Sequence, residues 1–167
     1  MYKNLLIIFF IIINFTSLKA EEKITFLNID NLIQNSNFGK STLKEIEDLN
    51  KKNLSELKKR EQDIRKKEQD LINKKNIILE EEFKKNALVV KKEINEFNLY
   101  KKQISVEFEN KKKDLLNKFF ERIRPIIEIY INENKISAVL NKKNIFIANK
   151  KYDITNDLIE VINEQIK

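Results

Sequence analysis

Three consecutive carboxylates, Glu80, Glu81 and Glu82, are the side chains whose grouping could most readily do acid–base chemistry. An enzyme would need further groups that this chain lacks. The sequence contains no histidine and no cysteine, which excludes imidazole bases, thiol nucleophiles and Cys/His zinc sites. Because it has a single glycine, it also has no glycine-rich loop that could hold a phosphate. We therefore predict that the protein is not an enzyme, that it uses no cofactor or metal, and that the three glutamates lie at a solvated turn.

Apolar side chains spaced along a charged segment could instead provide many weak contacts to another molecule. The candidates of this kind are Phe83, Val90, Phe97 and Phe108. Their spacing of seven, seven and eleven residues also suits the buried seam of a coiled coil, and for each residue alone the seam is the simpler interpretation. What these side chains can bind therefore depends on the elements that carry them.

The long segment between Gly39 and Pro125 contains neither glycine nor proline, which predicts long helices. Two apolar series with coiled-coil spacing run through it, and each misses one place: Leu43, Leu57, Ile64, Leu71 and Ile78, then Phe83, Ala87, Val90, Ile94, Phe97, Ile104 and Phe108. The phase changes within residues 76–83. We predict an antiparallel helical hairpin over residues 41–124 with its tip near 76–83; a phase slip inside one helix is the alternative.

Patterns typical of strands stand at both ends of this helical segment. Residues 23–30 form a β-prone run, and residues 136–140 and 145–148 predict a β-hairpin. The predicted fold class is α+β, mainly α: a coiled-coil arm and a small β-rich body built from residues 21–40 and 125–167. Three strands with short helices are too little to be stable alone, so we predict that several copies pool their strands.

Several residues mark expected helix boundaries. Asp30 could cap a short first helix, Thr42 with Glu45 has the spacing of a capping box, and Thr155 could cap the last helix, in which Leu158, Ile159, Ile162 and Ile166 share a face. Pro125 predicts a kink or a restart near the end of the second arm helix.

The first twenty residues predict a secretory signal peptide that is cleaved after Ala20. Lys3 gives the positive start, and residues 5–15 are apolar except for Asn14. A retained membrane anchor is the alternative, although the apolar run is shorter than the roughly 20 residues that span a bilayer. Export favours an extracytoplasmic protein.

The basic charge is concentrated in the predicted arm. The chain has a formal net charge of +7, and residues 40–118 contain 22 Lys and Arg against 16 Asp and Glu. Such a surface attracts acidic polypeptides and anionic lipid headgroups. It would also bind nucleic acid, but export argues against nucleic acid as a physiological partner.

The order of these elements resembles the Skp/OmpH family of exported chaperones. The resemblance covers residues 21–167 and rests on KITFLNID (23–30), NSNFGKSTLKEIE (35–47) and RPIIEIYINENKISAVLNKKNIFIANKKYDITNDLI (124–159). It implies a homotrimer with a shared β body and helical arms around a cavity. It further implies an ATP-independent holdase of the periplasm that binds unfolded outer-membrane proteins, with lipopolysaccharide as a further partner in some members. On this interpretation Phe83, Val90, Phe97 and Phe108 would contact the client.

A membrane-anchored structural stalk, similar to the stator b subunits of rotary ATPases, is the competing interpretation. Such stalks also join a short hydrophobic N-terminus to a long charged helix. The predicted strands and the short apolar run speak against it. N-terminal sequencing of the native protein separates the two, because a start at Glu21 removes the anchor and an intact Met1 retains it.

Overall fold

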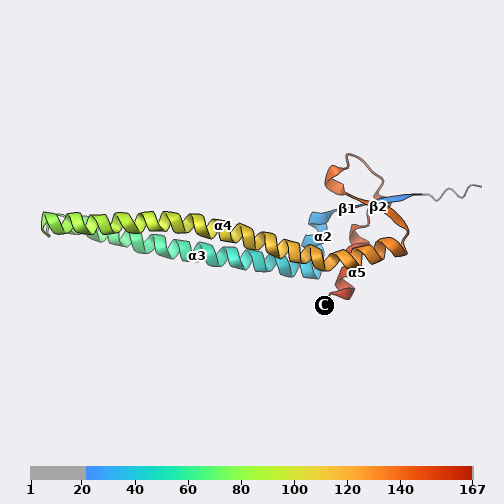
Figure 1. Cartoon of the computed structure of the whole chain (residues 1–167), viewed down its shortest axis with the longest axis horizontal. Coiled ribbons are helices and arrows are strands. Elements are labelled where there is room, and N and C mark those ends of the chain that lie inside the picture. The colour runs from blue at the N-terminus through green and yellow to red at the C-terminus, as the bar shows by residue number, and fades with distance from the viewer. Residues whose placement is uncertain (1–21, 167) are drawn as a thin grey trace, which may run out of the picture.

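The computed structural model describes residues 22–166, and it consists of a long helical arm with a small body at one end (Figure 1). The predicted signal peptide, residues 1–20, and its cleavage after Ala20 lie outside the described residues. The predicted fold class is confirmed: the chain is mainly helical with one small sheet.

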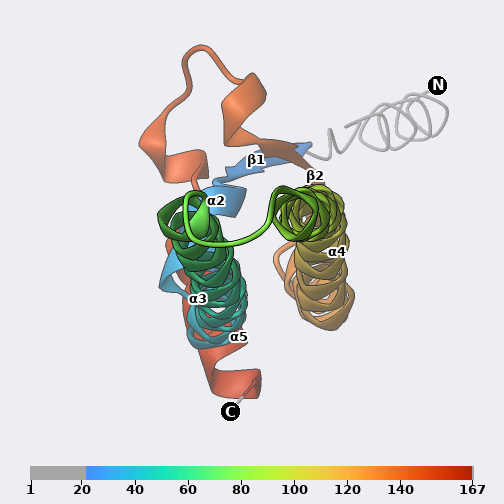
Figure 2. The same cartoon turned by 90° about the vertical axis from the view of Figure 1, so that its left-hand side faces the viewer.

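The arm is a hairpin of two antiparallel helices, α3 (Asn37–Lys74) and α4 (Glu80–Glu133). They lie side by side in both views, and residues 75–79 join them at the far end (Figures 1 and 2). At about 1.5 Å per residue, the 38 residues of α3 extend about 57 Å. The predicted helical hairpin is therefore correct, and a single continuous helix is excluded.

The two helices meet along a seam of half-buried side chains. From α3 these include Ile46, Leu49, Leu57, Ile64 and Leu71, and from α4 Phe83, Ala87, Val90, Ile94, Phe97, Ile104 and Phe108. No side chain in residues 43–114, all of which the structure describes, is fully buried. Because few apolar atoms are removed from water, we expect the arm to have low local stability.

The body contains two parallel strands, β1 (Lys23–Leu27) and β2 (Ile136–Asn141), which are neighbours in one sheet. Parallel strands need a long crossover connection, and here the entire arm supplies it. Two helices complete the body, α2 (Ile29–Asn35) and α5 (Thr155–Gln165), and two short 3-10 turns, η1 (Lys142–Asn144) and η2 (Lys150–Tyr152), lie between β2 and α5.

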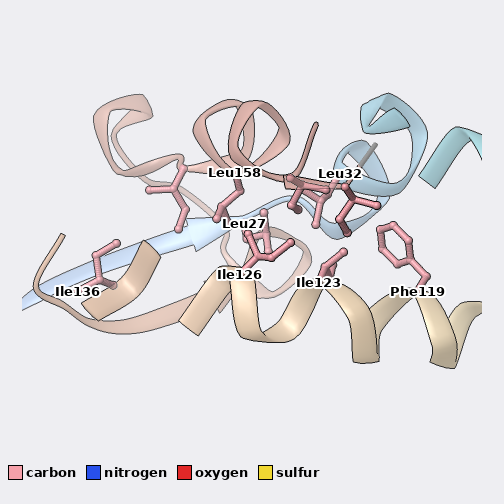
Figure 3. Packing of buried hydrophobic residues seen from close by; sticks show 10 residues of the cluster. Leu27, Leu32, Phe119, Ile123, Ile126, Ile136 and Leu158 are labelled. Atoms are coloured by element: carbon pink, nitrogen blue, oxygen red, sulfur yellow. The ribbon is translucent and has the colours of Figure 1, made fainter. Parts of the chain in front are cut away.

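The hydrophobic core lies where the base of the arm meets these elements (Figure 3). Its buried members come from β1, α2, α4, β2, the segment before α5 and α5 itself with its C-cap: Leu27, Leu32, Phe119, Ile123, Ile126, Ile136, Ile154, Leu158, Ile162 and Ile166. Three of the four residues predicted to share a face of the last helix are thus buried, and Ile159 packs against them half-buried. Phe119 and Ile123 belong to this core although they precede Pro125.

The predicted C-terminal β-hairpin is wrong. Residues 136–141 form a strand, but residues 145–148 do not, and the only strand that pairs with β2 in the described chain is β1. Asn141 and Asn149 explain the change, because each side-chain oxygen accepts a hydrogen bond from a backbone N–H two residues ahead and starts a 3-10 turn. The chain therefore leaves β2 in a loop.

The helix boundaries also differ from the predicted ones. Asn28, not Asp30, caps α2 by accepting a hydrogen bond from the Asn31 N–H (3.1 Å). Ser36 caps α3, and the Thr42 hydroxyl donates to the Phe38 carbonyl, so no capping box forms. α2 and α3 meet directly at Ser36, which moves the start of the long helix toward the N-terminus.

Pro125 does not restart a helix. α4 continues through it to Glu133, with Ile123 and Ile126 on either side of it buried in the core. Pro125 itself is exposed, and its missing N–H leaves the backbone carbonyl of Glu121 without the usual helical donor.

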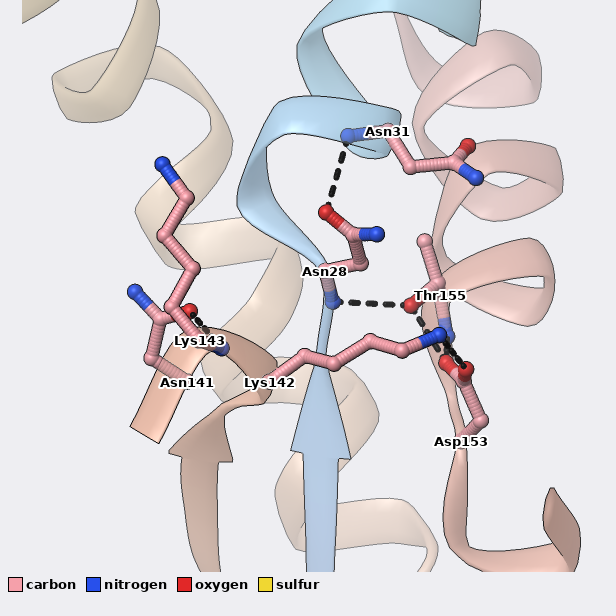
Figure 4. A network of polar contacts seen from close by, with 7 residues as sticks. All are labelled: Asn28, Asn31, Asn141, Lys142, Lys143, Asp153 and Thr155. Atoms are coloured by element: carbon pink, nitrogen blue, oxygen red, sulfur yellow. Dashed lines mark hydrogen bonds and ion pairs between the residues drawn. The ribbon is translucent and has the colours of Figure 1, made fainter. Parts of the chain in front are cut away.

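A polar network joins α5 to β1 (Figure 4). The Thr155 hydroxyl does not cap α5; it accepts a hydrogen bond from the Asn28 N–H (2.9 Å) and donates one to the Asp153 carboxylate. Asp153 also accepts from the Thr155 N–H (3.1 Å) and from Lys142 Nζ (3.3 Å). Burial alone would raise the pKa of Asp153, but the hydrogen bonds from Thr155 and Lys142 outweigh it and lower the pKa.

We expect Asp153→Asn to destabilise the body by about 1–2 kcal/mol at pH 7, because charge-assisted hydrogen bonds are lost. A carboxyl whose pKa is lower in the folded state contributes stability above its unfolded pKa of about 3.9 and loses it as pH falls through the folded pKa. The difference between wild type and variant, measured by urea unfolding, should therefore shrink below about pH 4. A difference that stays constant down to the folded pKa would contradict this role for the charge.

Candidate functional site

The four candidate binding residues all lie in the seam between the arm helices. Phe83, Val90, Phe97 and Phe108 are half-buried on the side of α4 that faces α3. They are spread along several turns of α4, so the structure does not bring them together into one pocket. Their role in contacting another polypeptide stays a prediction, since the helix partner already covers part of each side chain.

Small hollows open along the seam beside two of these residues. One hollow of about 260 Å³ is lined by Phe97 and Ile64 together with charged side chains of both helices. A second of about 260 Å³ is lined by Val90, Leu71 and Val89, again with lysine and carboxylate neighbours. Both are lined by apolar and charged side chains together, which suits weak contact with an amphipathic chain more than capture of a small molecule.

Polar side chains hold the two arm helices at this level. The Tyr100 hydroxyl donates to Glu56 Oε1 (2.5 Å), and the Arg60 guanidinium pairs with Glu56 (3.0 Å) and lies 3.8 Å from the centre of the Tyr100 ring. The hydrogen bonds from Tyr100 and Arg60 lower the pKa of Glu56, and the bond to Glu56 raises the pKa of Tyr100. Nearer the tip, Lys67 pairs with Glu93 across the helices (2.6 Å). The arm register is thus set partly by solvated polar pairs.

The three glutamates stand at the far end of the arm. Glu80, Glu81 and Glu82 occupy the first turn of α4 and are exposed, where negative charge is favoured by the helix dipole. Glu80 pairs with Lys84 (2.7 Å). Among the described residues, no three potential metal ligands of the types His, Cys, Asp and Glu come together.

Exposed aliphatic side chains on the arm were missed by the sequence reasoning. On α4 they are Leu88, Val89, Leu99, Val106 and, at the base, Ile129, on α3 Leu54 and Ile72, and at the tip Ile77 and Leu79; each is at least 50% exposed. A search limited to the heptad series finds only the seam. The sequence did contain a signal for these exposed side chains: most of them are apolar residues that fall outside the heptad series of a segment predicted to be a coiled coil.

The body also exposes an apolar patch. Ile24, Leu140, Phe146 and Ile147 are 47%, 48%, 103% and 85% exposed, and the last two belong to the loop after β2. Within the described chain β2 has a neighbour on one edge only. An exposed apolar loop and an open strand edge are each suited to pairing with another chain.

No helix between residues 22 and 166 combines the length and the apolar character that crossing a bilayer requires.

Comparisons with known proteins give a family and a fold. Residues 23–162 match the family model described as "Outer membrane protein (OmpH-like)". The structure is similar to the crystal structure of an OmpH-like protein from Caulobacter crescentus CB15, with a TM-score of 0.80 and 18% sequence identity over 89% of this chain and 88% of that one. No curated protein matches the sequence. At so low an identity the crystal structure establishes the similarity of the fold alone.

Proposed function

The chain belongs to the OmpH-like family, and on that basis we propose that it is an ATP-independent holdase chaperone of the periplasm that keeps unfolded outer-membrane proteins from aggregating. The Caulobacter protein is named as a candidate outer membrane chaperone, which agrees with this proposal. The observation that carries it is the arm: residues 43–114 contain no fully buried side chain and display aliphatic groups to solvent. An element built in this way is suited to binding, because its apolar groups are not used up in a core.

The chemistry of the client fits this surface. An unfolded β-barrel protein exposes alternating apolar residues and would otherwise associate with copies of itself. The arm offers aliphatic side chains and an excess of lysine, so it can make many weak apolar contacts and attract acidic segments. Many weak contacts together can hold a client without requiring a particular client sequence. They release it without nucleotide once folding into the membrane is more favourable than staying bound.

We further propose that three copies join through the body. The exposed loop residues Phe146 and Ile147 and the open edge of β2 support this assembly, because both would be covered by a neighbouring copy. A shared body would hold three arms around a common space. Cleavage after Ala20 would release the mature chain, and anionic lipid or lipopolysaccharide would be further ligands of the basic arms.

The test is dilution of a urea-denatured outer-membrane β-barrel protein into buffer with the purified mature chain. We expect light scattering from client aggregates to fall strongly at a small molar excess of chaperone, without ATP, and to fall less at high salt because screening weakens the lysine contribution. Bovine serum albumin at equal mass is the control for crowding. Unchanged aggregation would refute the holdase, and a stable folded monomer in static light scattering would refute the trimer.

A further inference from the structure

One face of α4 carries exposed aliphatic residues in a regular series. Leu88, Leu99 and Val106 are 67%, 67% and 60% exposed. They are separated by eleven and seven positions, about three and two helical turns, and therefore share a face. Seam residues such as Val90, Phe97 and Phe108 lie on the other side of the helix, against α3. We call this series the outer face of α4.

The outer face of α4 is also basic. Between residues 88 and 113, the other positions that lie within about 40° of the direction of Leu88 on the helix are Lys92, Asn95, Lys102, Asn110 and Lys113. No carboxylate falls among them. In the described chain Lys92 approaches Glu96 at 3.7 Å, while Lys102 and Lys113 make no ion pair. Three positive charges therefore alternate with three apolar side chains along one line.

A shallow open hollow borders this face on one side. It has a volume of about 780 Å³ and is lined by Asn98, Lys101, Lys102, Ser105 and Val106, all from α4. One outer-face lysine and one outer-face aliphatic thus border the same hollow. A chain lying there could place an apolar side chain beside Val106 and a carboxylate beside Lys102.

The other arm helix has no equivalent face. The positions of α3 that point away from the seam are all exposed and polar: Lys44, Asp48, Ser55, Gln62, Lys66 and Asn73. The exposed aliphatics of α3, Leu54 and Ile72, lie outside this polar face, nearer the seam. The two helices of the arm are therefore chemically different on their outer sides.

We propose that the outer face of α4 is the main contact surface for the client, an extended unfolded segment that contains apolar residues and carboxylates. This inference rests on the proposed function and names the side of the arm that performs it. From Leu88 to Val106 the face extends about 27 Å, the length of about eight residues of extended chain. The lysines fit carboxylates on such a segment. They do not fit a second copy of the same face, because that face has no carboxylate with which the lysines could pair.

Two matched double variants test the assignment. L88A/L99A removes two aliphatics from the outer face of α4, and L54A/I72A removes two of similar exposure from α3. With a fluorescently labelled, urea-denatured β-barrel protein as the probe, we expect L88A/L99A to weaken binding about 10-fold and L54A/I72A less than about 2-fold. Circular dichroism should show unchanged helicity in both, since all four side chains are exposed.

A second matched pair of double variants tests the lysines of the outer face of α4. We expect K92Q/K102Q to weaken binding and to reduce its dependence on salt, whereas K59Q/K66Q on α3, with the same loss of charge, should leave both nearly unchanged.

The outcomes separate the two proposals. Wild-type protein that neither binds the probe nor prevents its aggregation would refute the proposed function. If the wild type and all four double variants bind the probe equally well, the proposed holdase function holds but the assignment of the binding face is wrong. A smaller particle mass for L88A/L99A than for wild type would show that another copy occupies the face, which also overturns it.

Discussion

Phe119→Ala should lower the free energy of unfolding by about 3–5 kcal/mol, the largest effect of any single truncation in the body. Phe119 is fully buried, stacks on Phe38 with ring centroids 5.5 Å apart, and meets the edge of Phe120 at 5.4 Å. It lies where α4 passes under α2, so the cavity left by alanine would open at the junction of arm and body (Figure 3). A body with ten buried apolar core residues has little other packing to compensate.

Phe108→Ala is the matched control for this prediction. Phe108 lies three turns earlier on the same side of α4, but it is half-buried in the arm seam. Its removal should loosen the arm locally and leave the body intact. Urea unfolding combined with hydrogen exchange of peptides from α5 measures both effects. Equal loss of protection in α5 for the two variants would show that arm and body unfold as one unit and that the core does not have the separate role assigned to it.

Gly39→Ala should destabilise the protein by about 2–3 kcal/mol, opposite in sign to the effect expected from helix propensity. Inside a helix, alanine is ordinarily favoured over glycine by about 1 kcal/mol. At Gly39 a Cβ would collide with the backbone carbonyl oxygen of Ile33 and lie 2.7 Å from Ser36 Oγ. Ser36 cannot move aside freely, because its side chain caps α3 by accepting from the Gly39 N–H. The direct joint between α2 and α3 therefore requires glycine here.

Lys40→Ala provides the reference for Gly39→Ala, because Lys40 is the next residue of the same helix and is exposed. It should change stability by less than about 0.5 kcal/mol. Thermal unfolding by circular dichroism decides the sign. A melting temperature for Gly39→Ala at or above that of wild type would show that the joint opens easily and that the close contact does not constrain it.

Much of the arm could be predicted because its contacts are local and periodic. The steps of four and three from Phe83 to Phe108 place those residues on one face of any helix, whatever they pack against. The change of phase before Phe83 marked the turn. Periodicity does not predict what the residues outside the series contact. For that reason Leu88 and Leu99 were missed.

The body was predicted less completely because its contacts are distant in sequence. Residues 145–148 have strand propensity, but propensity does not specify a partner, and Asn141 and Asn149 form local turns instead. The pairing of β1 with β2 in parallel has no signal in either strand alone. Likewise, Thr155 has the sequence of a helix cap, yet its hydroxyl bonds to Asn28, 127 residues away.

Because β1 pairs with β2, the body can form only when the chain has been synthesised nearly to its end. The whole arm separates the two strands in the sequence, so a chain that emerges N-terminus first can form its hairpin arm before β2 and α5 exist. A product that stops before Ile136 would have an arm but neither a second strand nor a closed core. Truncated copies would therefore lack the surfaces through which we propose that complete copies meet, and their exposed core residues would make them more accessible to proteases.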